Sequence, residues 1–236
     1  RKLDGDEEKY RELFLHMMLN LEFLPNSPMF MNAGKRGGLI SSCYVLPLED
    51  STEGIFTTLK DAVIIHKRGA GTGFSFSSIR PKRDSVKGMP GVASGPLAFL
   101  KIFDRATSEI KQGARRAGGN MAILRVDHPD IIDFITIKDE RDTVTNYNLS
   151  VGITEEFMGA LKKQSDYNLY DPRTGDVCGT LNSKRIFDLI GLMAWKNGDP
   201  GIVFFDRMNN EKSNPTPHIG QCETTSPCGE YPLLSY

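Results

Sequence analysis

The sequence lacks the features that mark membrane-spanning and secreted proteins. No apolar run approaches the roughly 18 residues that a bilayer-spanning helix needs, and no secretory signal is visible. Neither sign of charge dominates, because 29 basic residues face 30 acidic ones and the net charge is -1. We therefore expect neither a nucleic-acid backbone nor an anionic membrane as a partner.

Cysteine is also scarce, with four residues in 236 and no C-x-x-C pair. Four thiols in a chain of this length form no disulfide framework, so a reducing, cytoplasmic location is predicted. His218, Cys222 and Cys228 match no common zinc spacing, and no metal site is expected. The chain begins with Arg1 rather than Met, which favours a piece of a longer polypeptide.

Neither glycine-rich loop completes a nucleotide-binding motif. The run at residues 69–73 precedes a strand, and Phe74 stands where G-x-G-x-x-G requires its third glycine. The run at residues 112–120 lacks the Gly-Lys-Ser/Thr of a P-loop. Its Arg115 and Arg116 suit phosphates or base edges, although an ordinary solvated basic loop is the alternative.

Apolar periodicity predicts alternating strands and helices along the chain. Strands are expected at residues 39–46, 72–79, 121–126, 147–153 and 202–205, a hairpin at 167–178, and helices at 7–21, 52–69, 97–111, 129–138, 155–163 and 184–197. Asp50 is predicted to cap the second helix, with Glu53 reaching back. Five strands with helical crossovers predict a parallel α/β sheet or half of a barrel. Such sheets carry their active sites at the carboxyl ends of the strands.

Residues 226–231, Ser-Pro-Cys-Gly-Glu-Tyr, form the most informative segment. Pro227 and Gly229 exclude a helix and disfavour a ladder strand, which leaves a tight loop. This loop presents the Cys228 thiol and the Glu230 carboxylate at a fixed separation. A thiol that removes a hydrogen atom beside a base that takes a proton needs that arrangement. The alternative is a surface turn with an uninvolved cysteine.

An ordered set of short motifs extends over nearly the whole chain. The motifs are LPNSP (24–28), NAG (32–34), SSC (41–43), GTGFS (71–75), IRP (79–81), SGP (94–96), RR (115–116), DHPD (127–130), GDPG (198–201), NPTPH (214–218) and PCGE (227–230). Each is weak alone, but the ordered set resembles the catalytic subunit of ribonucleotide reductase. The resemblance is greatest to the adenosylcobalamin-dependent class.

The resemblance implies a fold, a cofactor and partners. The family has a ten-stranded α/β barrel made of two five-stranded halves, with the radical cysteine on a finger loop. Residues 1–22 would end an N-terminal helical region, and residues 23–236 would form the first half-barrel and the tip of the finger loop. Adenosylcobalamin would be the cofactor and a ribonucleotide the substrate. Deoxynucleoside triphosphates or ATP would be effectors, thioredoxin or glutaredoxin the reductant, and a homodimer the assembly.

The resemblance also implies roles for individual residues. Cys228 would be the thiyl-radical cysteine, and Glu230 the base for the 3′-hydroxyl proton. Cys43 would be one of two cysteines that reduce the 2′ carbon and end as a disulfide. Ser226 stands where the family usually has Asn, and its single hydroxyl would bind a substrate hydroxyl less tightly or through water. Positions that match substrate contacts are Ser27, Ser42 and Gly71, and those that match effector contacts are Asp50, Ser51, Arg80, Arg115 and Arg116.

The predicted activity is reduction of ribonucleotides to 2′-deoxyribonucleotides for DNA synthesis, with the isolated piece inactive. A nucleotide-binding regulatory fragment is one alternative; it would use Asp50, Ser51 and Arg80 and leave Cys228 idle. A glycyl-radical-type enzyme is another, with the same barrel and finger-loop cysteine but other substrates. The presence of both Cys43 and Cys228 favours the reductase over this second alternative.

Overall fold

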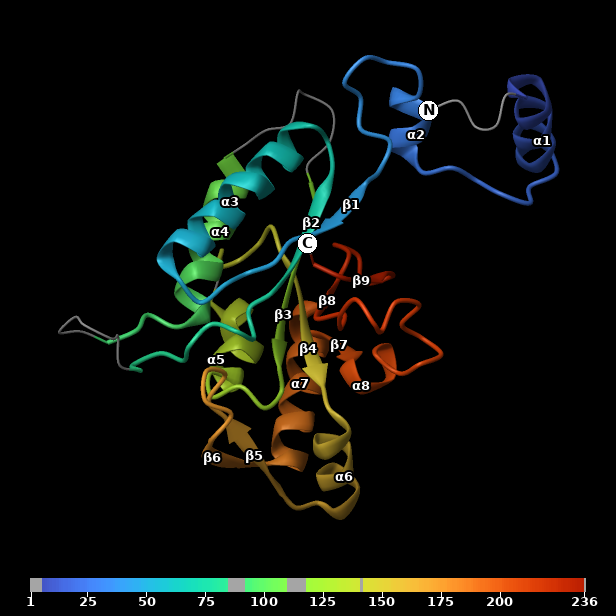
Figure 1. Ribbon diagram of the computed structural model, residues 1–236. Coiled ribbons are helices and arrows are strands. Elements are labelled where there is room, and N and C mark those ends of the chain that lie inside the picture. The colour runs from blue at the N-terminus through green and yellow to red at the C-terminus, as the bar shows by residue number, and fades with distance from the viewer. Residues whose placement is uncertain (1–5, 85–91, 110–117, 141, 236) are drawn as a thin grey trace. The chain divides into compact units, whose positions relative to one another are not determined.

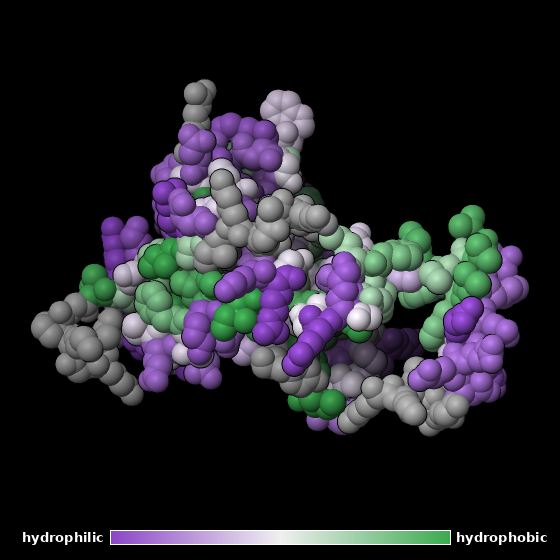
Figure 2. Space-filling view, turned by 90° about the horizontal axis from the view of Figure 1, so that it is seen from above, coloured by the Kyte–Doolittle hydropathy of each residue, from purple (hydrophilic) through white to green (hydrophobic). Residues whose placement is uncertain are grey.

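The computed structural model describes residues 6–84, 92–109, 118–140 and 142–235. The chain divides into two compact units, Arg1–Ser42 and Cys43–Tyr236. The first unit holds helices α1 (Glu7–Leu19) and α2 (Ser27–Asn32), whose amino ends are capped by side chains of Asp6 and Asn26. Helix α2 was not predicted, because a short helix carries little periodic signal. Apolar side chains remain on the surface of this unit (Figure 2), among them Phe14, Leu19, Leu21, Leu24 and Phe30.

The second unit is built on a five-stranded parallel sheet in the order β1-β2-β3-β4-β7. Its strands are β1 (Cys43–Val45), β2 (Gly71–Ser75), β3 (Asn120–Arg125), β4 (Asn148–Ile153) and β7 (Gly201–Phe204). All four neighbouring pairs are parallel. The prediction of a parallel α/β sheet is thus confirmed, and the five expected strands are the five that form it.

Helices cover one face of this sheet, and the C-terminal part of the chain covers the other (Figure 1). The covering helices are α3 (Thr52–Lys67), α4 (Pro96–Glu109), α5 (Ile131–Thr136) with a 3₁₀ turn (Ile137–Asp139), α6 (Glu155–Lys163) and α7 (Ser183–Asn197), whereas α8 (Phe205–Met208) belongs to the C-terminal part on the other face. Strands β5 (Asp166–Tyr170) and β6 (Val177–Asn182) form the predicted hairpin, and β8 (Thr224–Thr225) pairs with β9 (Pro232–Leu233). Helix α3 packs on β2 and α5 on β3, while β8 crosses β2 and β3 from the opposite side.

Strand β3 shows why both faces are filled. Successive side chains of a strand point to opposite faces, so Ala122 and Leu124 join the large cluster under the helices. Met121 and Ile123 instead join a smaller cluster with Phe205 on the other face. A strand buried on both sides reads as a continuous apolar run, as expected for a parallel sheet.

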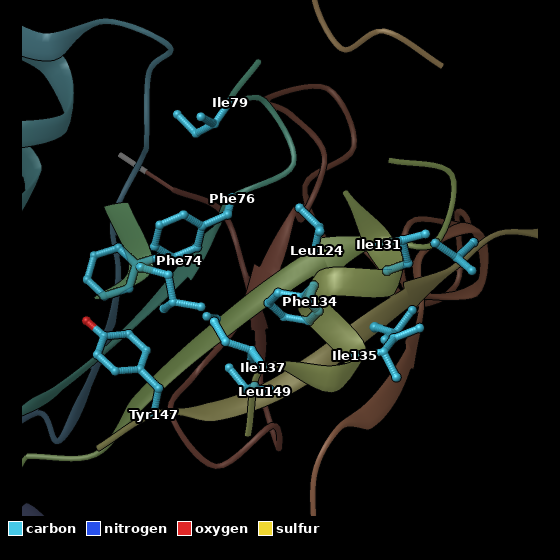
Figure 3. Packing of buried hydrophobic residues seen from close by; sticks show 14 of the residues in the cluster. Phe74, Phe76, Ile79, Leu124, Ile131, Phe134, Ile135, Ile137, Tyr147 and Leu149 are labelled. Atoms are coloured by element: carbon cyan, nitrogen blue, oxygen red, sulfur yellow. The ribbon is translucent and has the colours of Figure 1, made fainter. Parts of the chain in front are cut away.

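The large cluster is centred on aromatic rings (Figure 3). Phe74 and Phe76 of the β2 segment and Phe103 of α4 pack edge-to-face, with ring centroids 5.2 to 6.3 Å apart. Tyr147 lies 6.2 Å from Phe74, and burial raises the pKa of its hydroxyl far above the ordinary value. This packing anchors the starts of β2 and β4, on which the site described below depends.

The predicted cap of α3 was wrong by one residue. Ser51, not Asp50, is the cap, and its Oγ accepts a hydrogen bond from Gly54 N at 3.0 Å. The Asp50 carboxylate is occupied elsewhere, by Arg80. Within the ranges given above, no helix combines the length and apolarity needed to cross a membrane.

Candidate active site at the amino ends of the strands

The turn between β8 and β9 carries the predicted thiol and carboxylate. Ser226 N donates to Tyr231 O at 2.8 Å, and Gly229 N donates to Ser226 O at 3.0 Å, which closes the loop. Gly229 has a φ of 83°, a left-handed conformation that glycine adopts without steric cost. The tight loop predicted from Pro227 and Gly229 is therefore confirmed.

The loop lies directly on glycine residues of the sheet. A Cβ atom on Gly73 would lie 1.9 Å from Thr225 O, and one on Gly71 would lie 2.7 Å from the Pro227 ring. A Cβ on Gly119 would lie 3.4 Å from Pro227 Cβ. The glycines at these positions therefore allow the two backbones to approach, which is one of the recurrent uses of glycine in strands.

The loop sits at the amino ends of the strands. Cys43, Gly71, Asn120 and Asn148 are the first residues of β1, β2, β3 and β4, and the loop contacts or adjoins each of these positions. The expectation of a site at the carboxyl ends was wrong for this group of residues. The segment after α8 crosses the face of the sheet and brings its tip to the end where β1 to β4 begin. Local sequence patterns do not reveal this path.

The Glu230 carboxylate contacts both Ser226 in the loop and Cys43 at the start of β1. Its Oε2 accepts a hydrogen bond from Ser226 Oγ at 2.8 Å, and its Oε1 lies 3.9 Å from Cys43 Sγ. The Ser226 hydroxyl also accepts from Tyr231 N at 3.2 Å, and Ser226 is fully buried. The serine therefore orients the carboxylate of Glu230, and that carboxylate reaches the thiol of β1.

The predicted radical cysteine and the predicted reducing cysteine differ in exposure. Cys43 is half-buried at the start of β1, whereas Cys228 is exposed at the tip of the loop. Pro227, just before Cys228, is buried. The loop is thus held in place at the buried Pro227, while the Cys228 thiol is exposed. A group outside the loop can therefore reach the Cys228 sulfur.

A cavity of about 410 Å³ opens beside Cys43. This volume falls within the range of small-molecule sites, roughly 300–1,000 Å³. Its lining includes Val45, Asn214, Thr216, Cys222 and Leu233 as well as Cys43. Burial raises the pKa of the Cys222 thiol, which favours the protonated form there.

Asp50 and Arg80 form a separate polar pair, after the carboxyl ends of β1 and β2. Arg80 Nε donates to Asp50 Oδ2 at 2.8 Å, and its Nη2 donates to Asp50 O at 3.1 Å. The Arg80 backbone N–H donates to Asp50 Oδ1 at 3.2 Å. Both side chains are about four-fifths buried, so the pair also ties two loops together. Ser51 lies beside it as the cap of α3.

The remaining predicted site residues belong to the N-terminal unit or fall outside the described residues. Ser27 is the first residue of α2, and Ser42 is the last residue of the N-terminal unit. Arg115 and Arg116 lie outside the described residues. Over the described ranges, no three His, Cys, Asp or Glu side chains are grouped to hold a metal ion.

The sequence patterns missed a buried polar chain beneath the loop. His66 Nε2 donates to Thr72 Oγ1 at 2.9 Å, and Thr72 Oγ1 donates to Asn120 Oδ1 at 2.9 Å. Burial lowers the pKa of His66, which favours the neutral imidazole. Asn148 was missed as well; its Nδ2 donates to Pro227 O at 2.8 Å. The one sequence signal that could have indicated Asn120 and Asn148 is that each is a polar residue at the start of an apolar strand.

Comparison with known proteins places both parts of the chain in one family. Residues 41–236 match the model of the ribonucleotide reductase barrel domain, and residues 2–38 match that of its all-alpha domain. The chain is 49% identical over 228 residues to a vitamin B12-dependent ribonucleoside-diphosphate reductase of Thermoplasma acidophilum, covering 96% of this chain and 29% of the relative. It is 45% identical over 233 residues to a protein of the same name from Mycobacterium tuberculosis, covering 98% and 33%. A vitamin B12-dependent ribonucleotide reductase of Streptomyces avermitilis is 32% identical over 252 residues, covering 96% and 26%. The chain thus spans a third or less of the length of these relatives.

Proposed function

This chain belongs to the ribonucleotide reductase family, and we propose that the polypeptide containing it reduces ribonucleotides to 2′-deoxyribonucleotides through a cysteine radical. The observation that carries the proposal is the meeting of Cys43, Glu230 and the loop of Cys228 at one edge of the sheet. Cys43 lies 185 residues before Cys228 and 187 before Glu230 in the sequence. Only the fold brings them together, next to a cavity of small-molecule size.

Each side chain has a distinct part in the proposed reaction. The Cys228 thiyl radical removes the hydrogen atom from ribose C3′, which restores its S–H bond and leaves a radical on the sugar. The Glu230 carboxylate accepts the 3′-hydroxyl proton. The 2′-hydroxyl leaves as water with the proton of the Cys43 thiol. Cys43 and a second thiol then supply two electrons and become a disulfide, with the hydrogen of the second thiol going to C2′. Glu230 returns its proton to the 3′ oxygen, and Cys228 returns its hydrogen atom to C3′.

The environment of Glu230 supports its part in this reaction. The buried Ser226 hydroxyl holds one carboxylate oxygen at 2.8 Å and leaves the other near Cys43. A base held in this way is oriented before the substrate arrives, which is a main source of catalytic advantage. We expect Ser226 to act through Glu230 rather than by holding a substrate hydroxyl itself.

We infer adenosylcobalamin as the source of the radical, since the relatives are named as vitamin B12-dependent enzymes. The residues present fit such a group, because the exposed Cys228 and Gly229 at the loop tip are open to a bulky cofactor. When bound, the cofactor would supply the radical that removes the hydrogen atom from the Cys228 thiol. The buried base of the loop would hold that thiol at one place.

Further parts of the proposal concern binding and regulation. We expect Ser27, Ser42 and Gly71 to contact the substrate, and Asp50, Ser51, Arg80, Arg115 and Arg116 to contact a nucleoside triphosphate effector. The doubly hydrogen-bonded Arg80–Asp50 pair supports an effector site, because it holds a guanidinium in a fixed position between two loops. Thioredoxin or glutaredoxin would reduce the disulfide in the cytoplasm, and the assembly would be a homodimer. Residues 1–22 would belong to the helical region and 23–236 to the half-barrel.

Replacement of Cys228 by Ser in the complete polypeptide tests the central proposal. Serine keeps the size of the side chain but does not form the radical, so turnover should fall by about 10⁴-fold or more. Effector binding should not change. The matched control is Cys178→Ser, because Cys178 is also exposed but lies in the β5–β6 hairpin.

Substantial nucleotide reduction by the Cys228→Ser variant would refute the radical role. If the unaltered polypeptide binds nucleoside triphosphates but reduces no nucleotide, the regulatory alternative is correct instead. Reduction assays with all four ribonucleotides, with and without effector, distinguish these results.

A further inference from the structure

We propose that Asn148 is a positioning residue for the Cys228 thiol. Its side-chain Nδ2 donates to the carbonyl oxygen of Pro227 at 2.8 Å. This carbonyl belongs to the peptide that joins Pro227 to Cys228, so the hydrogen bond fixes the peptide plane from which the cysteine side chain leaves. The catalytic part of this inference rests on the function proposed above, but the structural part does not.

The loop needs such an anchor because its tip extends beyond its buried base. Thr224, Thr225 and Ser226 are at most 1% exposed, whereas Cys228 is exposed. On one side, Pro227 packs against Gly71 of β2 and against Gly119, the residue before β3. The bond from Asn148 reaches the same residue from β4, so the peptide before the thiol is held by packing and by a hydrogen bond.

The donor itself is held rigidly, because its neighbours are anchored on both sides. Tyr147 O accepts a hydrogen bond from Lys138 Nζ at 2.5 Å, and Leu149 N donates to Asp199 Oδ1 at 3.2 Å. Lys138 and Asp199 in turn form an ion pair at 2.6 Å, with both side chains more than four-fifths buried. A salt bridge in the protein interior therefore fixes the backbone on either side of Asn148.

A second set of contacts anchors the segment just before it. Asn146 N donates to Asp104 Oδ1 at 2.9 Å, and Asn146 O accepts from Asn120 Nδ2 at 3.2 Å. Asn120 also accepts from Thr72, so the starts of β2, β3 and β4 are joined by side chains. The start of β4 thus forms a fixed platform, and Asn148 is the residue of this platform that holds the loop tip.

Three variants of the complete polypeptide separate the hydrogen bond from simple packing. Asn148→Ala removes the side chain, and Asn148→Asp keeps its shape but replaces the donor by an acceptor that repels Pro227 O. Asn168→Ala is the control, because Asn168 is also a strand asparagine but bonds within the β5–β6 hairpin. The readouts are kcat and KM for nucleotide reduction, and amide hydrogen exchange of residues 224–233.

Both Asn148 variants should lower kcat by about 10- to 100-fold, since small misplacements of reacting groups have effects of that size. KM should change by less than about threefold, because the residue holds the thiol and not the substrate. Exchange at residues 224–233 should accelerate in both variants and remain normal in the control. A kcat and an exchange rate equal to those of the unaltered enzyme in Asn148→Asp would overturn the proposal.

The experiment also separates this inference from the proposed function. If the unaltered polypeptide reduces no ribonucleotide but Asn148→Asp accelerates exchange of the loop, the proposed function fails and the positioning contact stands. If the polypeptide reduces ribonucleotides and Asn148→Asp does so at the same rate, the positioning role fails and the function stands.

Discussion

At the scale of single residues, glycine decides where the loop can lie. Gly71 was predicted as a substrate contact, but the structure adds a steric reason for it, since the Pro227 ring occupies the space of a side chain. Gly73 is more constrained, because a Cβ there would lie 1.9 Å from Thr225 O, whereas the nearest atom to a Cβ at Gly71 is Gly119 O at 2.6 Å. The contacts with Pro227 and Thr225 were not visible in the sequence, because these residues lie more than 150 positions away.

Gly73→Ala should displace the loop. Its Cβ would meet the Thr225 carbonyl at 1.9 Å, so the free energy of unfolding should fall by about 1–3 kcal/mol, as in other overpacked interiors. Nucleotide reduction should fall with it, because Thr225 leads directly to the loop of Cys228. Chemical denaturation and activity assays of the complete polypeptide measure both effects.

The control for this substitution is Gly191→Ala in α7. Nothing lies within 4 Å of a Cβ at Gly191, and alanine favours a helix over glycine by up to about 1 kcal/mol. The control should therefore be neutral or stabilising. Equal stability and activity of Gly73→Ala and the unaltered protein would show that the loop does not rest on β2 in solution.

At the scale of elements, the sequence predicted what forms but not where each element ends. Helix α6 was predicted with its observed bounds, because Thr154 caps one end and the apolar period is clear. The strand predicted at 39–46 is only Cys43–Val45, since pairing with β2 and not apolar character sets its length. The misplaced cap of α3 has a similar cause, because Arg80 takes the Asp50 carboxylate from 30 residues away.

Arg80→Ala should weaken effector binding. Its removal leaves the mostly buried Asp50 without its ion-pair partner and disconnects the loops after β1 and β2. We expect a 10- to 100-fold rise in effector Kd, equivalent to about 1.4–2.7 kcal/mol. Equilibrium binding of nucleoside triphosphates to the complete polypeptide measures the change.

Two further substitutions show whether a loss of effector affinity is specific to the guanidinium of Arg80. Arg80→Lys keeps the charge but loses the planar fork, so it should recover only part of the affinity. Arg105→Ala removes an exposed pair with Glu109 on α4 and should have little effect. Unchanged affinity in Arg80→Ala would remove this pair from the effector site.

At the scale of the whole molecule, the parallel sheet was predictable and the position of the site was not. Five apolar runs separated by helical segments define the sheet, and its three central strands β2, β3 and β4 are buried on both faces. The edge that carries the site depends on how the chain crosses the sheet after α8, which no local pattern encodes. Cys43, Ser226 and Glu230, which the family resemblance named together, contact one another in the structure. The contact of Asn148 with Pro227 became visible only in three dimensions.

Two buried histidines should make the fold sensitive to acid. Burial lowers the pKa of His66 and of His128 in the folded protein below the ordinary value of 6.5. Below about pH 6.5 these two histidines bind protons in the unfolded chain but stay neutral in the folded chain. The free energy of unfolding therefore falls as pH falls. Denaturation of the complete polypeptide at pH 7.5 and pH 5.5 should show the lower stability at pH 5.5.

The variant His66→Gln assigns this effect, because glutamine can still donate towards Thr72 but does not titrate in this range. It should reduce the loss of stability between the two pH values, while His16→Gln on the surface of α1 should not. An unchanged pH dependence in His66→Gln would show that this histidine has no share in the effect.

The strand order has a practical consequence for handling this stretch of polypeptide. In the described residues β1 and β7 each have a strand on one side only, and Ile202 of β7 is 40% exposed. Such edge strands present unpaired backbone N–H and C=O groups that can pair with another extended chain. Produced by itself, the segment would tend to associate through these margins into insoluble material, so studies of its chemistry are best made on the longer polypeptide.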